Sequence, residues 1–121
     1  RGLQKRPFIS LKDFVKSAVN LVKFKPKNSF EVFNQTTELL GIKYMGITIS
    51  NHARRLGSNS KIKLIKNPRK EKERHNMKMD NKKFLKLLNS KPISFSQESE
   101  NILKSLILNK KTINKYKDSL I

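Results

Sequence analysis

The large excess of positive charge is the feature of this sequence that most restricts how the chain can fold. Lys and Arg number 28 against 9 Asp and Glu, which gives a formal net charge of +19 over 121 residues. A chain this basic repels itself when it is compact, and a polyanion beside it relieves that repulsion. Nucleic acid is the commonest polyanion in this position, and an anionic membrane surface is the second.

The charge is distributed in blocks along the chain. Residues 1–27 contain eight basic residues and one acidic residue, and residues 61–91 contain twelve basic and three acidic residues. Residues 28–60 contain only three basic and two acidic residues, and residues 92–121 contain five basic and three acidic residues. This pattern predicts that the near-neutral second block belongs to the packed core and that the first and third blocks provide binding surface.

The size and composition of the chain exclude several classes of protein. A chain of 121 residues has the length of a single domain. No apolar run approaches the ~18 residues that span a bilayer, so we expect a protein that is not transmembrane. Cysteine is absent, which excludes disulfides, a thiol nucleophile and any Cys-based zinc or iron–sulfur site.

Residues 10–24 carry the pattern of an amphipathic helix. Ser10 followed by Asp13 resembles a capping box, and Pro26 ends the helix. We expect the apolar face to pack against a second helix. A membrane-bound or targeting role for the same face is the alternative. The residues of this face recur at helical spacing: Leu11, Phe14, Val15, Ala18, Val19 and Val22.

The next two segments predict a helix and then a strand. Asn28 with Glu31 forms a second capping pattern, and Gly41 stands where a glycine commonly ends a helix. We therefore expect a helix over 28–40 that pairs with the helix over 10–24 as an αα-hairpin. The period then changes, and β-branched or aromatic residues favour a strand over 42–49. The residues that carry this strand pattern are Ile42, Tyr44, Ile47 and Ile49.

A second strand is predicted over 62–66, where Ile62 and Leu64 alternate with lysines. The segment between the two strands contains Ala53, Leu56 and Gly57, a spacing that is typical of the first helix and turn of a helix-turn-helix. A recognition helix would have to follow over 60–66. A DNA-binding regulator that uses residues 47–66 is therefore the alternative to a β-hairpin.

The last third of the chain is predicted as a basic linker followed by helices. Residues 66–83 contain almost no apolar residue apart from two methionines, which is too little to fold alone. Asp80 or Asn81 is expected to cap a short helix, and Ser94 with Gln97 a longer one whose tail continues as a frayed helix. The apolar residues of the two helices are Phe84, Leu85, Leu87 and Leu88 in the first, and Ile102, Leu103, Leu106 and Ile107 in the second.

The predicted fold is α+β and dominated by helices. An N-terminal αα-hairpin precedes a region whose pattern allows a two-stranded β-hairpin, and a basic linker and C-terminal helices follow. The expected organisation is a basic N-terminal extension at 1–9, a small folded core at 10–66, a basic linker or arm at 67–80, and a helical extension at 81–121.

The candidate binding residues are basic side chains that could contact phosphates. Arginine offers a fixed fork of donors that suits bidentate phosphate contact, and lysine a point charge. The densest run, over 66–83, is expected to lie along a nucleic-acid backbone. The alternatives for this run are a solvated linker and an exposed helix in which Glu71 and Glu73 pair with basic residues three or four positions away. The candidate nucleic-acid-binding residues are Lys5, Arg6, Arg54, Arg55, Lys61, Lys63, Lys66, Arg69, Lys70, Lys72 and Arg74.

Asn51 and His52 could join the two arginines beside them at a phosphate. Base stacking would need exposed aromatic rings among basic residues. Phe8, Phe24 and Tyr44 are placed in this way, whereas the remaining phenylalanines of the apolar stripes are expected in the core. Those core candidates are Phe14, Phe30, Phe33 and Phe84.

No pattern of catalysis is found. The two histidines, His52 and His75, have no supporting ligand cluster, so we expect no metal site, and no cofactor or small-molecule substrate is indicated. The acidic residues lie in capping or lysine-rich settings rather than in pairs. The sequence therefore predicts a protein that is not an enzyme.

Small size, high basicity, a modest folded centre and polar basic extensions together indicate a structural RNA-binding protein of a ribonucleoprotein. We expect a component of a ribosomal subunit that contacts rRNA and neighbouring ribosomal proteins. The abundance of Lys, Asn and Ile, whose codons are AT-rich, and a first residue other than Met favour an organellar ribosome in the mitochondrial matrix. A peripheral membrane or complex-assembly subunit that uses the helix over 10–24 is a further alternative.

Overall fold

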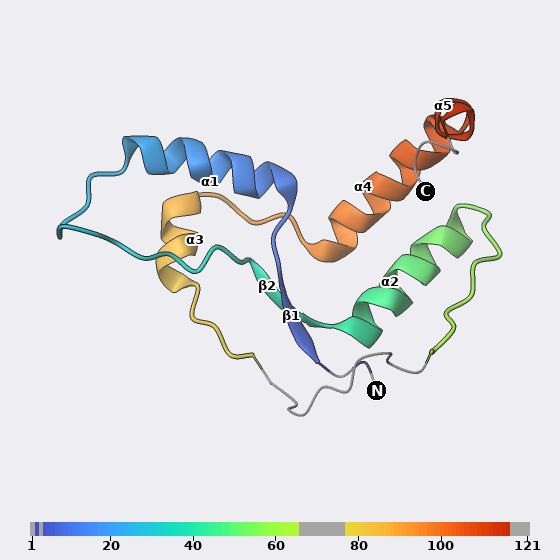
Figure 1. Cartoon of the computed structure of the whole chain (residues 1–121), viewed down its shortest axis with the longest axis horizontal. Coiled ribbons are helices and arrows are strands. Elements are labelled where there is room, and N and C mark those ends of the chain that lie inside the picture. Colours follow the sequence, from blue (N-terminus) through green and yellow to red (C-terminus); the bar gives the residue numbers. More distant parts are fainter. Residues whose placement is uncertain (1, 3, 66–76, 117–121) are drawn as a thin grey trace.

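The computed structural model describes residues 2, 4–65 and 77–116, and the fold is α+β with helices dominating, as predicted. Two helix pairs flank a short two-stranded ribbon: α1 and α3 lie on one side of it, α2 and α4 on the other (Figure 1). The elements are β1 (Lys5–Phe8), α1 (Leu11–Lys23), β2 (Glu38–Gly41), α2 (Ile42–Arg55), α3 (Lys82–Leu88), α4 (Phe95–Leu108) and α5 (Lys110–Lys115).

The ribbon joins two segments that are distant in sequence. β1 and β2 are antiparallel, with Lys5 opposite Gly41 and Phe8 opposite Glu38. The backbone N–H of Thr37 donates to the carbonyl of Phe8 at 2.8 Å, which extends the pairing beyond the ribbon. Pro7 is compatible with β1 because a strand at the edge of a sheet can lack one N–H donor. The pairing of β1 with β2 therefore holds the N-terminal basic segment against the middle of the chain.

The first capping prediction is confirmed, but α1 is oriented opposite to expectation. The Ser10 hydroxyl accepts a 3.0 Å hydrogen bond from the backbone N–H of Asp13. The buried face of α1 is polar, with Asp13 4% exposed and Ser17 0% exposed, whereas Val22 on the apolar face is 88% exposed. The predicted packing of the apolar stripe against a second helix is therefore wrong. The polar face is buried instead, because its side chains form hydrogen bonds with backbone groups elsewhere in the chain.

The predicted αα-hairpin is wrong, because residues 24–37 form neither helix nor strand. This segment is held instead by long-range polar contacts. Gln35 Nε2 donates to the Ser17 hydroxyl at 2.7 Å, and Asn81 Nδ2 donates to the carbonyl of Thr36 at 2.9 Å. These tertiary hydrogen bonds override the local helix pattern.

The middle of the chain also differs from the expected strand pair. Gly41 is the N-cap of α2 rather than the end of a helix, and the predicted strand over 42–49 is the first half of that helix. The apolar residues of this segment also fit helical spacing, because Met45, Ile49 and Ala53 fall on one face of a helix. Residues 62–65 form no strand, and residue 66 lies outside the described residues.

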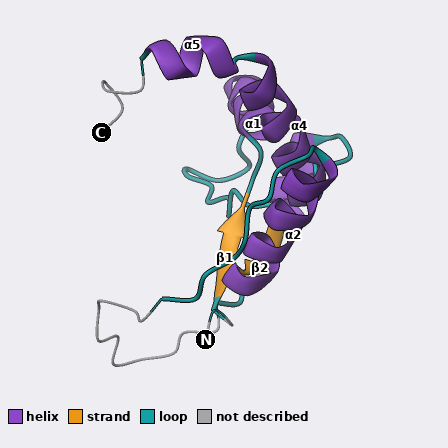
Figure 2. Ribbon diagram, turned by 90° about the vertical axis from the view of Figure 1, so that its right-hand side faces the viewer, coloured by secondary structure: helices purple, strands orange, loops and turns teal. Residues whose placement is uncertain are grey.

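The C-terminal helices form as predicted. In α3, Phe84 and Leu88 are fully buried. The Ser94 hydroxyl caps α4 by accepting from the backbone N–H of Gln97 at 3.2 Å. α5 continues the chain beyond Asn109, and Figure 2 shows it turning away from the end of α4.

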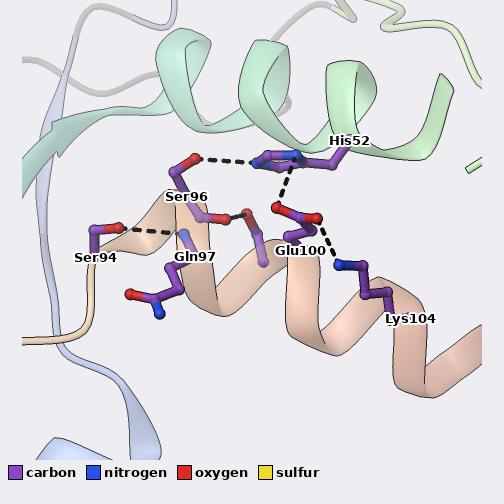
Figure 3. Close-up of polar contacts among 7 residues, drawn as sticks. His52, Ser94, Ser96, Gln97, Glu100 and Lys104 are labelled. Atoms are coloured by element: carbon purple, nitrogen blue, oxygen red, sulfur yellow. Dashed lines mark hydrogen bonds and ion pairs between the residues drawn. The ribbon is translucent and has the colours of Figure 1, made fainter. Parts of the chain in front are cut away.

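α2 and α4 pack through a mixed interface, drawn in Figure 3. His52 Nε2 lies 3.1 Å from the Ser96 hydroxyl, and His52 Nδ1 lies 3.9 Å from a carboxylate oxygen of Glu100. Glu100 also pairs with Lys104 at 2.7 Å. Phe95, the first residue of α4, contacts the ribbon. Its ring packs edge-on against the ring of Phe8 in β1, with the two centroids 5.1 Å apart.

The apolar core is small. Among the described residues, the buried apolar side chains are Ala53, Phe84, Leu88 and Phe95. Many large apolar side chains are instead exposed, on α2 and in the loops as well as in two groups on the outer face of α1 and on α4 with α5. The two groups consist of Leu11, Phe14, Val15, Val19, Leu21 and Val22 on α1, and Ile102, Leu106, Ile107, Leu108 and Tyr116 on the C-terminal helices.

Candidate nucleic-acid interface

A basic pocket is lined by residues from the end of α1, the segment over 24–37 and α3. These elements lie at the left of Figure 1. Its volume is about 650 Å³, within the range of small-ligand sites. We call it the lysine pocket. Its charged and aromatic lining consists of Lys23, Phe24, Lys25, Lys27, Glu31, Phe33, Lys83 and Lys86.

The end of α1 creates one wall of the lysine pocket. Phe24 leaves the helix with extended backbone, and its N–H donates to the carbonyl of Leu21 at 3.1 Å. Pro26 then prevents the helix from resuming. Asn20 fixes the wall against α3, because its Nδ2 donates to the carbonyls of Leu87 and Leu88 at 2.9 and 3.2 Å.

Two aromatic rings line the lysine pocket. The rings of Phe24 and Phe33 are 5.3 Å apart between centroids and nearly perpendicular, at 88°. The Lys83 ammonium lies 4.7 Å from the centroid of the Phe33 ring, in a cation–π contact. Both rings are half-buried, and both line the pocket.

The charge of the lysine pocket is only partly neutralised. Glu31 pairs with Lys83, and this hydrogen bond holds the pKa of the Glu31 carboxyl below its ordinary value of 4.5, with a smaller contribution from Lys27. Within the described part of the chain, no carboxylate lies within ion-pair distance of the other four lysines: Lys23, Lys25, Lys27 and Lys86. An anion entering the pocket would therefore meet unpaired ammonium groups.

A second basic hollow lies beside the C-terminal half of α2. Arg54 and Lys61 line it together with Ser50, Asn59 and Ser60, and its volume is about 580 Å³. The Arg54 guanidinium donates to the side-chain oxygen of Asn51. The structure thus brings together two predicted phosphate contacts, Arg54 and Lys61.

The other predicted binding residues are distributed over separate surfaces. Lys5 and Arg6 are exposed on β1, and Arg55 is exposed at the end of α2, near Glu100. Lys63 is exposed in a segment without helix or strand. The predicted contacts of the basic run lie outside the described residues: Lys66, Arg69, Lys70, Lys72 and Arg74.

Two expectations about this region are corrected. His52 does not join the arginines at a phosphate, because it is 7% exposed and contacts α4. Residues 58–65 form no helix, so the described part of 60–66 provides no recognition helix for a helix-turn-helix.

The aromatic predictions are partly confirmed. Phe24 does line a basic surface, and Phe84 is buried. Phe8 packs on Phe95, and Tyr44 is exposed on α2. Phe33 also lines the lysine pocket, while Phe14 and Phe30 are exposed rather than in the core.

The five lysines of the pocket were absent from the predicted binding residues. Lys23 and Lys83 are 60 positions apart, and only the docking of α1 on α3 brings their surroundings together. A local signal existed at Phe24, which lies between Lys23 and Lys25 and was predicted to be available for stacking.

Comparison of the chain with protein-family models, with curated proteins and with solved structures gave no match. Within the described residues, no helix has the length and apolar character needed to cross a bilayer. The same residues contain no cluster of side chains suited to hold a metal ion.

Proposed function

We propose that the protein is a structural RNA-binding component of a ribonucleoprotein, specifically of a mitochondrial ribosomal subunit. One observation carries the proposal: within residues 2, 4–65 and 77–116, most cationic side chains form no ion pair with a carboxylate. Among the described residues, Lys83 and Lys104 are the Lys or Arg side chains that form an ion pair with a carboxylate. The other cations of that part of the chain are available to phosphates, which neutralise positive charge at RNA surfaces.

The exposed apolar faces support a place within a larger assembly. A monomer rarely exposes large contiguous apolar patches, and such patches mark interaction surfaces. The outer face of α1 carries Leu11, Val15 and Val22 in one exposed row. In the proposed function this face and the end of α4 dock on neighbouring ribosomal proteins while the basic surfaces contact rRNA.

The test is sedimentation of a tagged form through a sucrose gradient of mitochondrial lysate, at low and then at high salt. An integral component travels with a ribosomal subunit and remains there at high salt. A purely electrostatic passenger with ~6–10 phosphate contacts loses about 10³–10⁵ in affinity between about 50 and 200 mM salt. Recovery at the top of the gradient under both conditions would overturn the proposal.

A second candidate function follows from the exposed face of α1. A basic helix with an exposed apolar row suits a peripheral membrane subunit, since Lys12, Lys16 and Lys23 flank that row. Flotation with anionic liposomes at low salt tests it, and failure to float rejects it. The DNA-binding alternative has less support, because residues 58–65 form no helix.

A further inference from the structure

We propose that the lysine pocket binds one unpaired nucleotide of an RNA strand, with the base against Phe24 and Phe33 and the adjoining phosphates on the surrounding lysines. This inference rests on the proposed function and assigns its RNA contact to a specific site. Apart from Lys83, the residues involved lie outside the basic run over 66–83, to which the sequence alone assigned the strongest contact.

The aromatic pair provides a surface for a base. Every base has a flat π-face, and stacking on phenylalanine rings is the usual way that proteins hold an unstacked base. The two rings meet edge to face, 5.3 Å apart, and both line the same pocket. Two rings in the interior of a core would offer no such surface. These rings are half-buried and border an open space of about 650 Å³.

The cations are arranged around this surface on three elements. Lys23 ends α1, Lys25 and Lys27 follow Phe24 along the chain, and Lys86 lies on α3. A strand that places one base on the rings has phosphates on both sides of that nucleotide. Lysines on several sides of one aromatic surface match this distribution of charge better than they match a single isolated anion.

The pocket favours a single strand over a duplex. A base in a duplex is stacked on both faces and cannot lie on a protein ring without leaving the helix. The occupant is therefore a nucleotide of a loop, bulge or strand end. A lipid headgroup would satisfy the lysines but would leave the aromatic surface without a planar partner.

The experiment uses the full chain and three fluorescein-labelled probes: a ten-residue oligouridine, a ribose-phosphate strand of the same length without bases, and a blunt RNA duplex. Fluorescence anisotropy gives the affinity for each at two salt concentrations. We expect the oligouridine to bind more tightly than the strand without bases, because only the former can stack on the rings.

The aromatic variant is Phe24→Leu with Phe33→Leu, which keeps apolar side chains in the pocket. Its matched control is Phe30→Leu, in the same segment but 76% exposed and outside the pocket lining. We expect the double variant to lose about fivefold or more in affinity for oligouridine, since stacking on each ring contributes strongly to binding of a base. Its affinity for the strand without bases should not change, and the control should match the unaltered protein with every probe.

The charge variant changes Lys23, Lys25 and Lys27 to Gln. Its control changes Lys12, Lys16 and Lys110 to Gln, with the same loss of net charge outside the pocket. The salt dependence of oligouridine binding should fall by about 0.7 in slope for each lost phosphate contact in the pocket variant only. Circular dichroism confirms that all variants keep their helix content.

The outcomes separate this inference from the proposed function. If the unaltered protein binds none of the probes, both fail. If it binds all three probes equally, and if pocket and control variants weaken binding to the same extent, the pocket inference is rejected and RNA binding through general basicity remains. Selective loss of oligouridine binding in the aromatic variant supports the pocket.

Discussion

The carboxylate of Asp13 accepts a 2.8 Å hydrogen bond from the backbone N–H of Ile93, a residue 80 positions further along the chain. Asp13 is nearly fully buried, so this bond is made away from water. It ties the first turn of α1 to the connection between α3 and α4. Together with Asn20, which bonds to the end of α3, it holds α1 with its polar face inward.

Replacing Asp13 by Ala should therefore destabilise the fold. The change removes a hydrogen bond to a charged acceptor and leaves the Ile93 N–H without its partner, at a cost of about 1.5–3 kcal/mol in the free energy of unfolding. Urea unfolding followed by circular dichroism measures the difference. The control is Lys12→Ala on the exposed side of the same helix, and equal midpoints for the two variants would show that the buried contact is not stabilising.

Replacing Val22 by Glu should leave the fold intact and weaken assembly. Val22 is 88% exposed, and exposed substitutions away from special features change stability by about 0.5 kcal/mol or less. A carboxylate on the apolar row of α1 would oppose docking, because the charge would lose its water on contact. Under the proposed function, the sucrose gradient should show less of this variant with a ribosomal subunit, while the urea midpoint stays constant. Normal sedimentation of the variant would exclude this row as a docking surface.

Replacing Glu31 by Gln should tighten RNA binding. The carboxylate is the acidic group among the lysines of the pocket, and it engages Lys83. Its removal takes away a repulsion toward a phosphate bound in the pocket, so we expect the affinity to rise by about twofold. Anisotropy with the oligouridine probe measures this effect. Glu100→Gln removes the same charge outside the pocket and serves as the control, so an equal gain in both variants would indicate net charge alone.

Acid should weaken the contact between Glu100 and its neighbours. The hydrogen bond from Lys104, and secondarily the nearby charges of Lys104, His52 and Arg55, lower the pKa of the Glu100 carboxyl below its ordinary value of 4.5. A lowered carboxyl pKa stabilises the folded state fully above the unfolded value, and this contribution disappears as the pH falls through the folded value. Thermal melts from pH 6 to about pH 3 should show a smaller acid-induced loss for Glu100→Gln than for the unaltered protein. Added salt should reduce the difference, because the Glu100 side chain is 40% exposed to solvent.

Helix capping at Ser10 and Ser94 was predictable from the sequence, because it depends on residues that are close together in the sequence. The Ser10 hydroxyl meets the N–H of Asp13, and the Ser94 hydroxyl meets the N–H of Gln97, each three positions away. The same local reasoning failed at Asn28 and Glu31, where a similar pattern begins no helix. There Glu31 pairs with Lys83, 52 positions distant, and a tertiary contact replaces the local one.

The sequence predicted several basic binding residues but not the lysine pocket. Charge density pointed to the basic run over 66–83 and to Arg54 and Lys61, and the last two do share a basic hollow. The lysine pocket could not be located in this way, because its walls come from α1 and α3. The contact between Phe24 and Phe33 also depends on the segment over 24–37, which contains no helix although the sequence predicted one over 28–40.

The sequence by itself determined the basic character of the protein, the helix-dominated class and the first residues of α1 and α4, because charge and capping depend on residue type and near neighbours. Tertiary structure alone decided that β1 pairs with β2, that α1 turns its polar face inward and that five lysines surround two aromatic rings. These features arise from contacts between segments tens of residues apart. Their free energy depends on which backbone groups a buried side chain reaches, and such long-range partners leave no periodic signal in the sequence.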